Sequence, residues 1–500
     1  MDASPNRPEP PASSSGSRLP RVGRRHWVLV ALCSLAFLTY LDRIAISRVQ
    51  EDVARDLRFD ALTAADEQML VDEGASDDVE RRTALASERS TDRMAWVFTA
   101  FLIGYVLFEI PGGRLGDLYG PRRVITRIVI WWSMFTLLTG SVHGIGGWIS
   151  RDPSPELLFA ILIIVRFLFG LGEAGAFPNI ARALGRWFPY RERARAQGLI
   201  WMSSRVGGAL GPVIVGALMR FAGDWETAFW CLGVVGVVWA IAFRIWYRDR
   251  PEDMAGTSDA ERAWIRGETG DDGVDRVDDR VAGSIYDDRP GEKPPWRRLA
   301  LWPNVLAMYV ASACVSFSFY FYLTFLPRYL KDVHAVEFAD SEVMCGLPIA
   351  AGCVACIAGG RLSDALGARL ASHRWARSLP GLIGFSGAGI AMGATVWAPN
   401  AWTAVALLTV AFFCQDLGVP CIWSLPADIG GRHAGVLAGA MNSLGAVGGV
   451  LSPLVAASVR RDGEGGWDAV LWIYGAVYIA GGLAWLAIDA SKRLEDRTPR

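Results

Sequence analysis

The sequence repeats one short pattern in its two halves. The first copy, at residues 112–123, reads GGRLGDLYGPRR, and the second copy, at residues 359–369, reads GGRLSDALGAR. Both copies fit GGRLxDxxGxR, and each directly follows a long apolar run. Internal duplication on this scale is the signature of membrane carriers that are assembled from two similar helix bundles around a central site. The repeat therefore predicts an all-α membrane protein with two pseudo-symmetric bundles.

Long apolar runs extend this prediction to the whole chain. Hydrophobic residues make up 52% of the 500 residues and charged residues only 20%, and the charges gather between the runs. Each run reaches roughly 20 residues, which is enough to cross a hydrocarbon core of about 30 Å. This number of runs argues against a soluble α-helical protein with buried core helices. The expected spans are twelve, at 27–46, 94–113, 122–142, 157–177, 195–220, 226–246, 303–326, 343–362, 376–398, 401–424, 432–459 and 468–488.

Arginines mark one side of the membrane. They crowd the N-terminal flank and the loops after the second, fourth and eighth spans, whereas the long segment after the first span is acidic. By the positive-inside rule both termini lie in the cytoplasm, so we expect a multi-pass protein of the plasma or inner membrane. The first span has no small-residue cleavage site, which favours a retained helix over a signal peptide.

Composition divides the chain into five segments. Within the polar segments that connect the apolar runs, we expect short helices at 258–266, 61–70 and 79–86. The segments are a disordered cytoplasmic tail (1–26), a first six-helix bundle (27–246) with an extracellular insert (47–93), a cytoplasmic linker (247–302), a second six-helix bundle (303–490) and a cytoplasmic tail (491–500).

The positions of the cysteines and histidines argue against an enzyme. All eight cysteines lie in or beside apolar runs, and Cys353 and Cys356 have ligand-like spacing but no matching second pair. The five histidines lie outside the spans or at their ends, and neither a Ser-His-Asp set nor a phosphate-binding loop appears. We expect no catalytic residue, no metal, no cofactor and no nucleic-acid partner, and a monomer in the lipid bilayer.

The repeated loops have a physical logic as gates. Glycines let the second and eleventh spans approach closely, while an aspartate and arginines can form ion pairs at helix ends. Such contacts would close the cytoplasmic side and break when that side opens. A purely topological role for the arginines would explain their sign but not the aspartate or the glycines. The expected gating residues are Gly113, Arg114, Asp117, Arg122, Arg166, Arg361, Asp364 and Arg369.

Ionisable residues inside the spans of the first half need a reason, because a charge there costs roughly 2.5–3.5 kcal/mol on insertion scales. Asp42 and Arg43 lie in the first span, and anchoring in the headgroup region is the alternative to a functional role. Glu173 lies in the fourth span on one face with Arg166, so a structural ion pair is the alternative to a proton carrier. Arg205 in the fifth span either contacts an anion or pairs with an acidic residue.

These motifs resemble those of the major facilitator superfamily, whose fold is two six-helix bundles. The repeated loops look like its signature. Within the superfamily, Tyr40-x-Asp42-Arg43, the run from Arg166 to Pro178 and Ile110-Pro111-Gly112-Gly113 resemble the anion:cation symporters. That branch includes proton-coupled carriers of hexuronates, galactonate and other organic acids. The likeness runs from the first span to the twelfth and includes 260–265 and 295–299 in the linker.

The resemblance implies roles for matching positions. Arg43 would bind the substrate carboxylate, and two carboxylates would carry protons, namely Asp42 and Glu173. Arg205 departs from sugar-acid carriers, which often have an uncharged polar residue near this place; we include it as a substrate contact because an extra cation favours a more anionic substrate. The long acidic insert is a second departure. The other implied substrate contacts are Tyr40, Tyr105, Trp423 and Asn442.

The resulting hypothesis is a secondary active transporter. It would couple the movement of a small organic anion, a sugar acid or another carboxylate, to protons or another cation by alternating access. One alternative is an organophosphate or phosphate exchanger, because Arg43 and Arg205 together would suit a divalent anion. The other alternative is a non-transporting membrane sensor on the same scaffold, which would use the insert or the linker for signalling.

Overall fold

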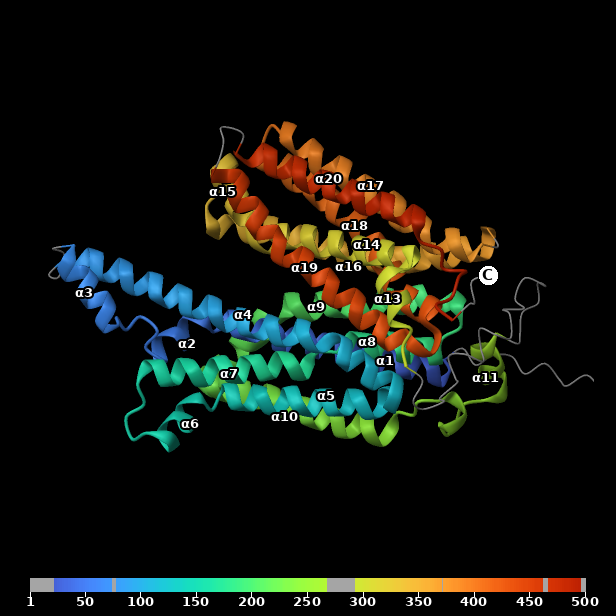
Figure 1. The fold of residues 1–500 in the computed structure, drawn as a ribbon, viewed down its shortest axis with the longest axis horizontal. Coiled ribbons are helices and arrows are strands. Elements are labelled where there is room, and N and C mark those ends of the chain that lie inside the picture. Colours follow the sequence, from blue (N-terminus) through green and yellow to red (C-terminus); the bar gives the residue numbers. More distant parts are fainter. Residues whose placement is uncertain (1–21, 74–77, 268–292, 371, 462–465, 496–500) are drawn as a thin grey trace, which may run out of the picture.

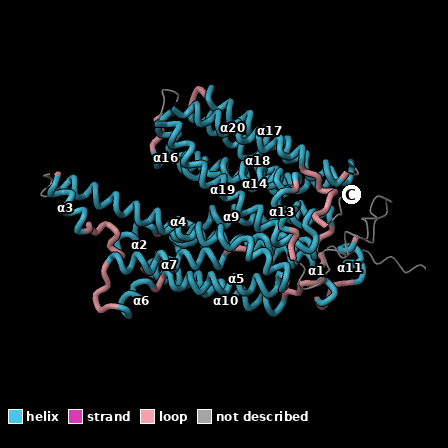
Figure 2. Tube along the Cα trace, in the orientation of Figure 1, coloured by secondary structure: helices cyan, strands magenta, loops and turns pink. Residues whose placement is uncertain are grey.

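The computed structural model describes residues 22–73, 78–267, 293–370, 372–461 and 466–495. In these segments every regular element is a helix, as Figure 2 shows. Most of the predicted tail at 1–26 and the middle of the linker lie outside the described residues.

Two sets of long helices follow one another along the chain (Figure 1). The first set consists of α1 (Arg24–Arg48), α4 (Val79–Tyr119), α5 (Pro121–Thr139), α7 (Pro155–Glu173), α8 (Ala176–Trp187), α9 (Tyr190–Ala222) and α10 (Trp225–Trp246). The second set consists of α14 (Pro303–Tyr320), the π-helical turn η2 (Phe321–Phe325), α15 (Leu326–His334), α16 (Phe338–Leu370), α17 (His373–Ala394), α18 (Ala401–Gly430), α19 (Ala434–Arg461) and α20 (Gly466–Ala487).

The helices account for the predicted number of spans. Ten helical segments of the described residues are long and apolar enough to cross a membrane, and α5 with the bent α6 (Val142–Ile149) makes eleven. One of these segments, Ala401–Val459, contains both α18 and α19, which are separated by the 3-10 turn η4 (Gly431–His433). When α18 and α19 are counted separately, the number of segments that could cross a membrane rises from eleven to twelve. The predicted fold class is therefore confirmed.

The helix that contains the second predicted span begins about four turns before that span and takes in the short helix expected at 79–86. The second span was expected to begin at residue 94, but α4 begins at Val79 and projects beyond the apolar part of the helix. The prediction ended the span where charges begin, since charges are excluded from lipid. Outside lipid the same charged residues continue the helix by pairing with α3 (Ala64–Asp72), as Arg82 does with Glu67 at 2.6 Å and Arg81 with Glu73 at 3.0 Å. A further short helix, α2 (Gln50–Asp56), connects α1 to this hairpin.

The fourth span is broken where one helix was predicted. Residues 155–187 form α7 and α8, with Gly175 between them at φ 86°, a left-handed conformation that favours glycine. Gly175 also lies against Gly112 of α4, where a Cβ on either residue would come within 2.8 Å of the other's backbone. The break therefore lets α4 approach the fourth span at the first glycine of the repeated loop.

The described ends of the linker form short helices. The expected helix at 258–266 is α11 (Asp259–Arg266), capped by the Ser258 hydroxyl, and the other end carries α13 (Trp296–Leu301). Glu261 of α11 is buried and accepts hydrogen bonds from the backbone nitrogens of Arg24 and Arg25 at 3.1 and 2.9 Å. This part of the linker therefore packs on the start of α1.

We call the side of the molecule with α11, α13 and the described C-terminal end the linker side, and the side with α2, α3 and α6 the insert side (Figure 1). The two helix sets converge on the linker side and diverge toward the insert side. The second glycine of each repeat lies at the convergence. A Cβ on Gly113 would overlap the carbonyl oxygen of Gly435 in α19, and a Cβ on Gly360 would lie 2.5 Å from the carbonyl oxygen of Ala194 in α9. The duplicated motif thus makes two equivalent close contacts between the bundles.

Candidate functional site

Arg43 and Glu173 form a buried ion pair between α1 and α7. The Nε atom of Arg43 donates a hydrogen bond to Oε1 of Glu173 at 3.1 Å, and a second guanidinium nitrogen binds the same oxygen. The side chain of Glu173 is 1% exposed, whereas that of Arg43 is 24% exposed. The other carboxylate oxygen of Glu173 has no hydrogen-bond partner among the described residues. Arg43 is therefore both held by an acid and open to a ligand.

Aromatic rings surround the guanidinium of Arg43. Its central carbon lies 4.6 Å from the ring centre of Tyr105 and 5.3 Å from those of Tyr40 and Phe101. Such rings stabilise a cation through their negative faces. Because they also exclude water, an anion that reaches Arg43 would meet it in a less polar medium than water.

An aromatic layer joins the two bundles close to this site. Tyr40 contacts Phe177 and Trp201, with ring centres 6.1 and 6.4 Å apart. Trp423 of α18 packs on both, at 5.1 Å from Trp201 and 5.7 Å from Phe177. Since α1 runs from the linker side, and Tyr40 precedes Arg43 by three residues, this layer lies on the linker side of Arg43. Trp423 is thus the predicted residue of the second bundle that completes this aromatic layer.

Asp42 and Arg166 are enclosed in the first bundle near the ion pair. Asp42 is buried, and no ion pair between described residues joins it to Arg43. Burial of Asp42 and pairing of Arg43 with Glu173 do not fit a headgroup anchor. Arg166 is also buried and lies 4.5 Å from the ring centre of Phe169, but it does not form the alternative ion pair with Glu173. Two guanidinium nitrogens of Arg166 have no hydrogen-bond partner among the described residues, and this arginine does not lie at the repeated loops with the other predicted gating residues.

Asn442 connects the second bundle to two residues of α4. Its amide nitrogen donates to the hydroxyl of Tyr105 and to Oε1 of Glu109, both at 3.0 Å. Glu109 is fully buried, and its second oxygen has no hydrogen-bond partner among the described residues. Glu109 is not among the residues that the sequence predicts for the site. Its signal was a second polar residue one helical turn after Tyr105, on the same face of the span.

Arg205 takes the second of its two predicted alternatives. Its Nε and one terminal nitrogen each lie 3.2 Å from an oxygen of Asp416 in α18, and both side chains are buried. The Arg205 guanidinium lies 4.4 Å from the ring centre of Phe319, and Gln415 donates to Asp416 at 3.0 Å. In this conformation a carboxylate of the protein therefore occupies the place where a substrate anion would meet Arg205.

Asp117 of the first repeated loop closes the linker side. It pairs with Arg182 of α8 at 2.6 Å, and it accepts hydrogen bonds from the backbone nitrogens of Gly435 and Val436 at 2.9 and 2.8 Å. These two residues lie in the first turn of α19, where free N–H groups favour an anion. Arg122 has a different partner, because its guanidinium donates to the carbonyl oxygen of Arg244. The half-buried Arg114 lies three residues before Asp117.

Asp364 of the second loop makes the equivalent contact in the opposite direction. It accepts a hydrogen bond from the backbone nitrogen of Arg195 in α9 at 3.1 Å and pairs with Arg377 of α17 at 3.1 Å. Arg377 also pairs with Asp428 at 2.9 Å, which in turn pairs with Arg193 of α9 at 2.8 Å. Arg361 and Arg369, by contrast, are exposed and have no hydrogen bond or ion pair within the described part of the chain.

The family follows from the sequence of the whole chain. A model of the Major Facilitator Superfamily matches residues 32–453. The chain belongs to this superfamily. It is a multi-pass membrane transporter rather than an enzyme, and the match spans both copies of the repeated loop.

Members of the superfamily that transport anions are similar to this chain along most of its length. The probable sulfoacetate transporter SauU of Cupriavidus necator is 30% identical over 472 residues, which are 94% of this chain and 95% of the relative. The probable galactarate/D-glucarate transporter GudP of Bacillus subtilis is 26% identical over 467 residues, which are 93% and 91% of the two chains. These relatives agree with the predicted likeness to anion symporters of the superfamily.

Solved structures of the superfamily share the fold. The proton:xylose symporter XylE superposes with a TM-score of 0.66 at 14% identity and covers 94% of this chain and 99% of its own. The human organic anion transporter MFSD10 superposes with a TM-score of 0.61 at 16% identity and covers 92% and 99%. At these identities the likeness concerns the arrangement of the helices.

Proposed function

We propose that this transporter is a proton-coupled symporter of a small organic anion that carries a carboxylate or sulfonate group. The observation that carries the proposal is the ion pair of Arg43 with Glu173 in a buried aromatic setting. The names of the relatives, which include sulfoacetate and galactarate/D-glucarate transporters, support an organic acid as the substrate.

Competition for Arg43 would couple the proton to the substrate. A substrate anion that binds Arg43 displaces the carboxylate of Glu173. A buried carboxylate without its cation is costly, so Glu173 takes up a proton and stays neutral while the anion is bound. The buried Asp42 is the second carboxylate placed to exchange protons near this site. Anion and proton therefore bind together, which is the requirement for symport.

Alternating access would follow from the state of the two sides. The linker side is held by Asp117, Asp364 and Asp428, while Arg43 is partly exposed. We infer that the linker side faces the cytoplasm, because the arginine-rich loops lie there. In this orientation the site loads from outside, and closure of the bundles around a neutralised site would break the linker-side contacts and release the substrate inside.

Transport by purified protein in proteoliposomes tests this function. We expect an inward proton gradient to drive the uptake of labelled sulfoacetate or galactarate, and Arg43→Gln to abolish it. Glu173→Gln mimics the protonated acid, so it should lose the response to the gradient but keep exchange of labelled for unlabelled substrate. Glu156→Gln is the matched control, because this exposed residue begins the same helix α7. The proposal fails if Glu173→Gln keeps wild-type stimulation by the gradient.

Two alternatives predict other outcomes. A phosphate exchanger, suggested by the relative named sodium-dependent phosphate transport protein 1 of Arabidopsis thaliana (24% identical, covering 94% and 80% of the two chains), would perform counterflow with preloaded phosphate without a pH gradient. The pairing of Arg205 with Asp416 counts against it, because Arg43 is then the one of these two arginines that is open for an anion. A sensor would bind a substrate but give no flux in either assay.

A further inference from the structure

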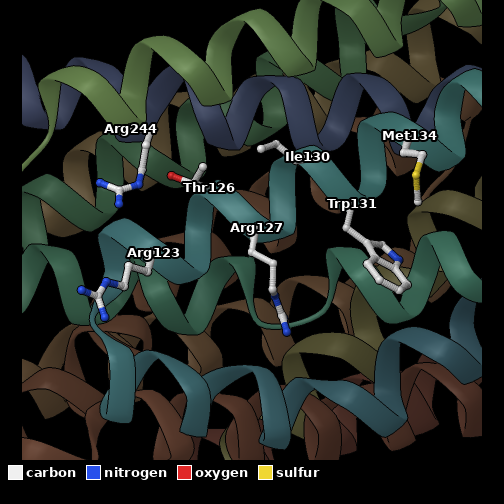
Figure 3. Close-up of a pocket in the computed structure, with 7 residues that line it drawn as sticks. All are labelled: Arg123, Thr126, Arg127, Ile130, Trp131, Met134 and Arg244. Atoms are coloured by element: carbon white, nitrogen blue, oxygen red, sulfur yellow. The ribbon is translucent and has the colours of Figure 1, made fainter.

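A surface pocket with three arginines lies on the outer face of the first bundle (Figure 3). Its volume is about 370 Å3, and it is lined by α5 and by the end of α10. Arg123 and Arg127 of α5 and Arg244 of α10 are all exposed. Figure 3 shows Arg123 and Arg244 toward one end of the pocket, Trp131 and Met134 toward the other, and Arg127 between them. The pocket shares no residue with the transport site, although Trp131 donates a hydrogen bond to the carbonyl oxygen of Leu168 in α7, the helix that carries Glu173.

The three arginines have no partner within the protein. None of them makes a side-chain hydrogen bond or an ion pair with any described residue. The neighbouring Arg122 adds to the positive charge, and its guanidinium is satisfied by the carbonyl oxygen of Arg244. The nearby Asp249 accepts a hydrogen bond from the backbone nitrogen of Arg122 and does not pair with the three. The pocket thus presents an excess of positive charge to its surroundings.

These surroundings are lipid at the membrane boundary. Since α5 begins at Pro121 on the linker side, Arg127 lies about 9 Å along the spanning helix and faces outward. Charged residues in spans nearly always face the interior of a bundle, and an outward arginine this close to a helix end extends its guanidinium to the headgroup region, where lipid phosphates are its available anions. Beyond Arg127 the pocket continues over the exposed Ile130 and Met134 and the half-buried Trp131. This order, cations at the boundary followed by an apolar wall, matches a phospholipid from headgroup to acyl chain.

We propose that this pocket binds one anionic phospholipid of the leaflet on the linker side. The headgroup phosphate lies among Arg123, Arg127 and Arg244, and an acyl chain lies along Ile130, Trp131 and Met134. Charge complementarity selects an anionic lipid over a zwitterionic one, because the latter brings its own cation to a site that has no acid to receive it. This binding is independent of the transported substrate.

Native mass spectrometry of the full chain tests the site. Protein purified in neutral detergent is titrated with phosphatidylglycerol or phosphatidylcholine of the same acyl chains. We expect the wild type to retain one phosphatidylglycerol in preference to phosphatidylcholine. Each arginine near the surface contributes roughly a fivefold preference, so Arg123→Gln, Arg127→Gln and Arg244→Gln combined should remove it.

A control variant outside the pocket and a single variant within it complete the test. Arg220→Gln removes an exposed arginine at the insert-side end of α9 and should leave the preference unchanged. If the triple variant does not fold, Arg127→Gln alone should lower the preference about fivefold. An unchanged preference in these variants would mean that the arginines serve topology only and would overturn the proposal. Displacement of the lipid by millimolar inorganic phosphate would overturn it too, because the pocket would then be a site for a soluble anion.

Discussion

Arg205 and Asp416 illustrate how one residue pair can join the two bundles. The pair is buried and bidentate, with both distances at 3.2 Å, and it links α9 to α18. Burying two charges costs about as much as their attraction returns, whereas leaving one of them without its partner is strongly unfavourable. The pair therefore adds little net stability but makes each partner dependent on the other.

The stabilities of a single and a double variant measure this dependence. We expect Asp416→Asn to destabilise the protein by about 3 kcal/mol, because Arg205 stays buried without an anion. Replacing both residues by apolar ones, as in Arg205→Met with Asp416→Leu, should restore most of that stability. The measurement is thermal unfolding in detergent. Equal losses for the single and the double variant would show that the pair is not coupled in this way.

For single residues, the sequence shows where the charged residues of the site lie along the chain better than it shows which residues they pair with. Arg43 and Glu173 stand out as charges inside apolar runs, but they are 130 residues apart, so only the packing of α1 against α7 can show that they pair. Arg166 shares a helix face with Glu173 and is the partner of the alternative structural ion pair, yet the structure pairs Glu173 with Arg43. Asp416 and Glu109 escaped notice as site residues because their significance comes from contacts made by the opposite bundle.

The hairpin of α3 and α4 contains a buried carboxylate, that of Asp66, whose hydrogen bonds stabilise it. Asp66 is fully buried there and accepts hydrogen bonds from the backbone of Thr63 and from Nε of Arg89, both at 2.9 Å. Burial alone would raise the pKa of Asp66, but the hydrogen bonds of Thr63 and Arg89 outweigh it and hold the pKa below its usual value. The ionised carboxylate therefore stabilises the folded hairpin.

The hairpin should lose stability in acid. Because the pKa of Asp66 is lower in the folded state, its contribution is complete above the unfolded value of roughly 3.9 and is lost as the pH falls through the folded value. Amide hydrogen exchange in residues 79–93, corrected for the intrinsic rate, should show protection that decreases below about pH 4. Asp66→Asn should lower protection at neutral pH and remove this dependence. Glu67→Gln, which changes a partly exposed carboxylate, is the control, and an equal effect of both variants would contradict the prediction.

The close contact between α4 and α19 at Gly113 can also be tested. A side chain on Gly113 would collide with Gly435, so Gly113→Val should keep α4 and α19 apart on the linker side. The buried Cys356, whose carbonyl group lies against Gly198 at the contact of α16 with α9, should then react faster with N-ethylmaleimide. Gly144→Val is the control, since nothing lies within 4 Å of an added Cβ there. Labelling of Cys356 at the wild-type rate would rule out this role of Gly113.

At the scale of elements, the sequence predicts the spans but not where helices continue or break. Apolar length marks each span, yet α4 runs far beyond its apolar part because α3 supplies partners for its charges. The break at Gly175 depends on the approach of Gly112 from another span, and the sequence of the fourth span alone reads as one helix. Both the extension of α4 and the break at Gly175 arise from tertiary contacts that periodicity does not contain.

The whole molecule is held closed on one side by two related sets of contacts. Asp117 reaches from the first bundle to the start of α19, and Asp364 reaches from the second bundle to α9. The repeat in the sequence predicts that two such loops exist, because each bundle carries one copy. It does not predict which side of the molecule is closed, since both conformations of a transporter have the same sequence and differ in which side makes contacts between the bundles.

Weakening both sets should shift the molecule to the opposite conformation. We expect Asp117→Asn with Asp428→Asn to leave Arg182, Arg193 and Arg377 without their strongest partners, which destabilises closure of the linker side. Spin labels at residues 119 and 370, in a background without the eight native cysteines, should then move farther apart.

A second pair of labels distinguishes rocking from local loosening. Residues 47 and 458 are exposed toward the insert-side ends of α1 and α19, and rigid rocking of the bundles should bring them closer as the linker side opens. Local unfolding of the loops would lengthen the first distance and leave the second unchanged. Asp52→Asn in the insert is the control, because its ion pair with Arg55 lies within α2 and joins no bundles. A molecule that keeps both distances in the double variant would show that closure depends on the glycine contacts rather than on the ion pairs.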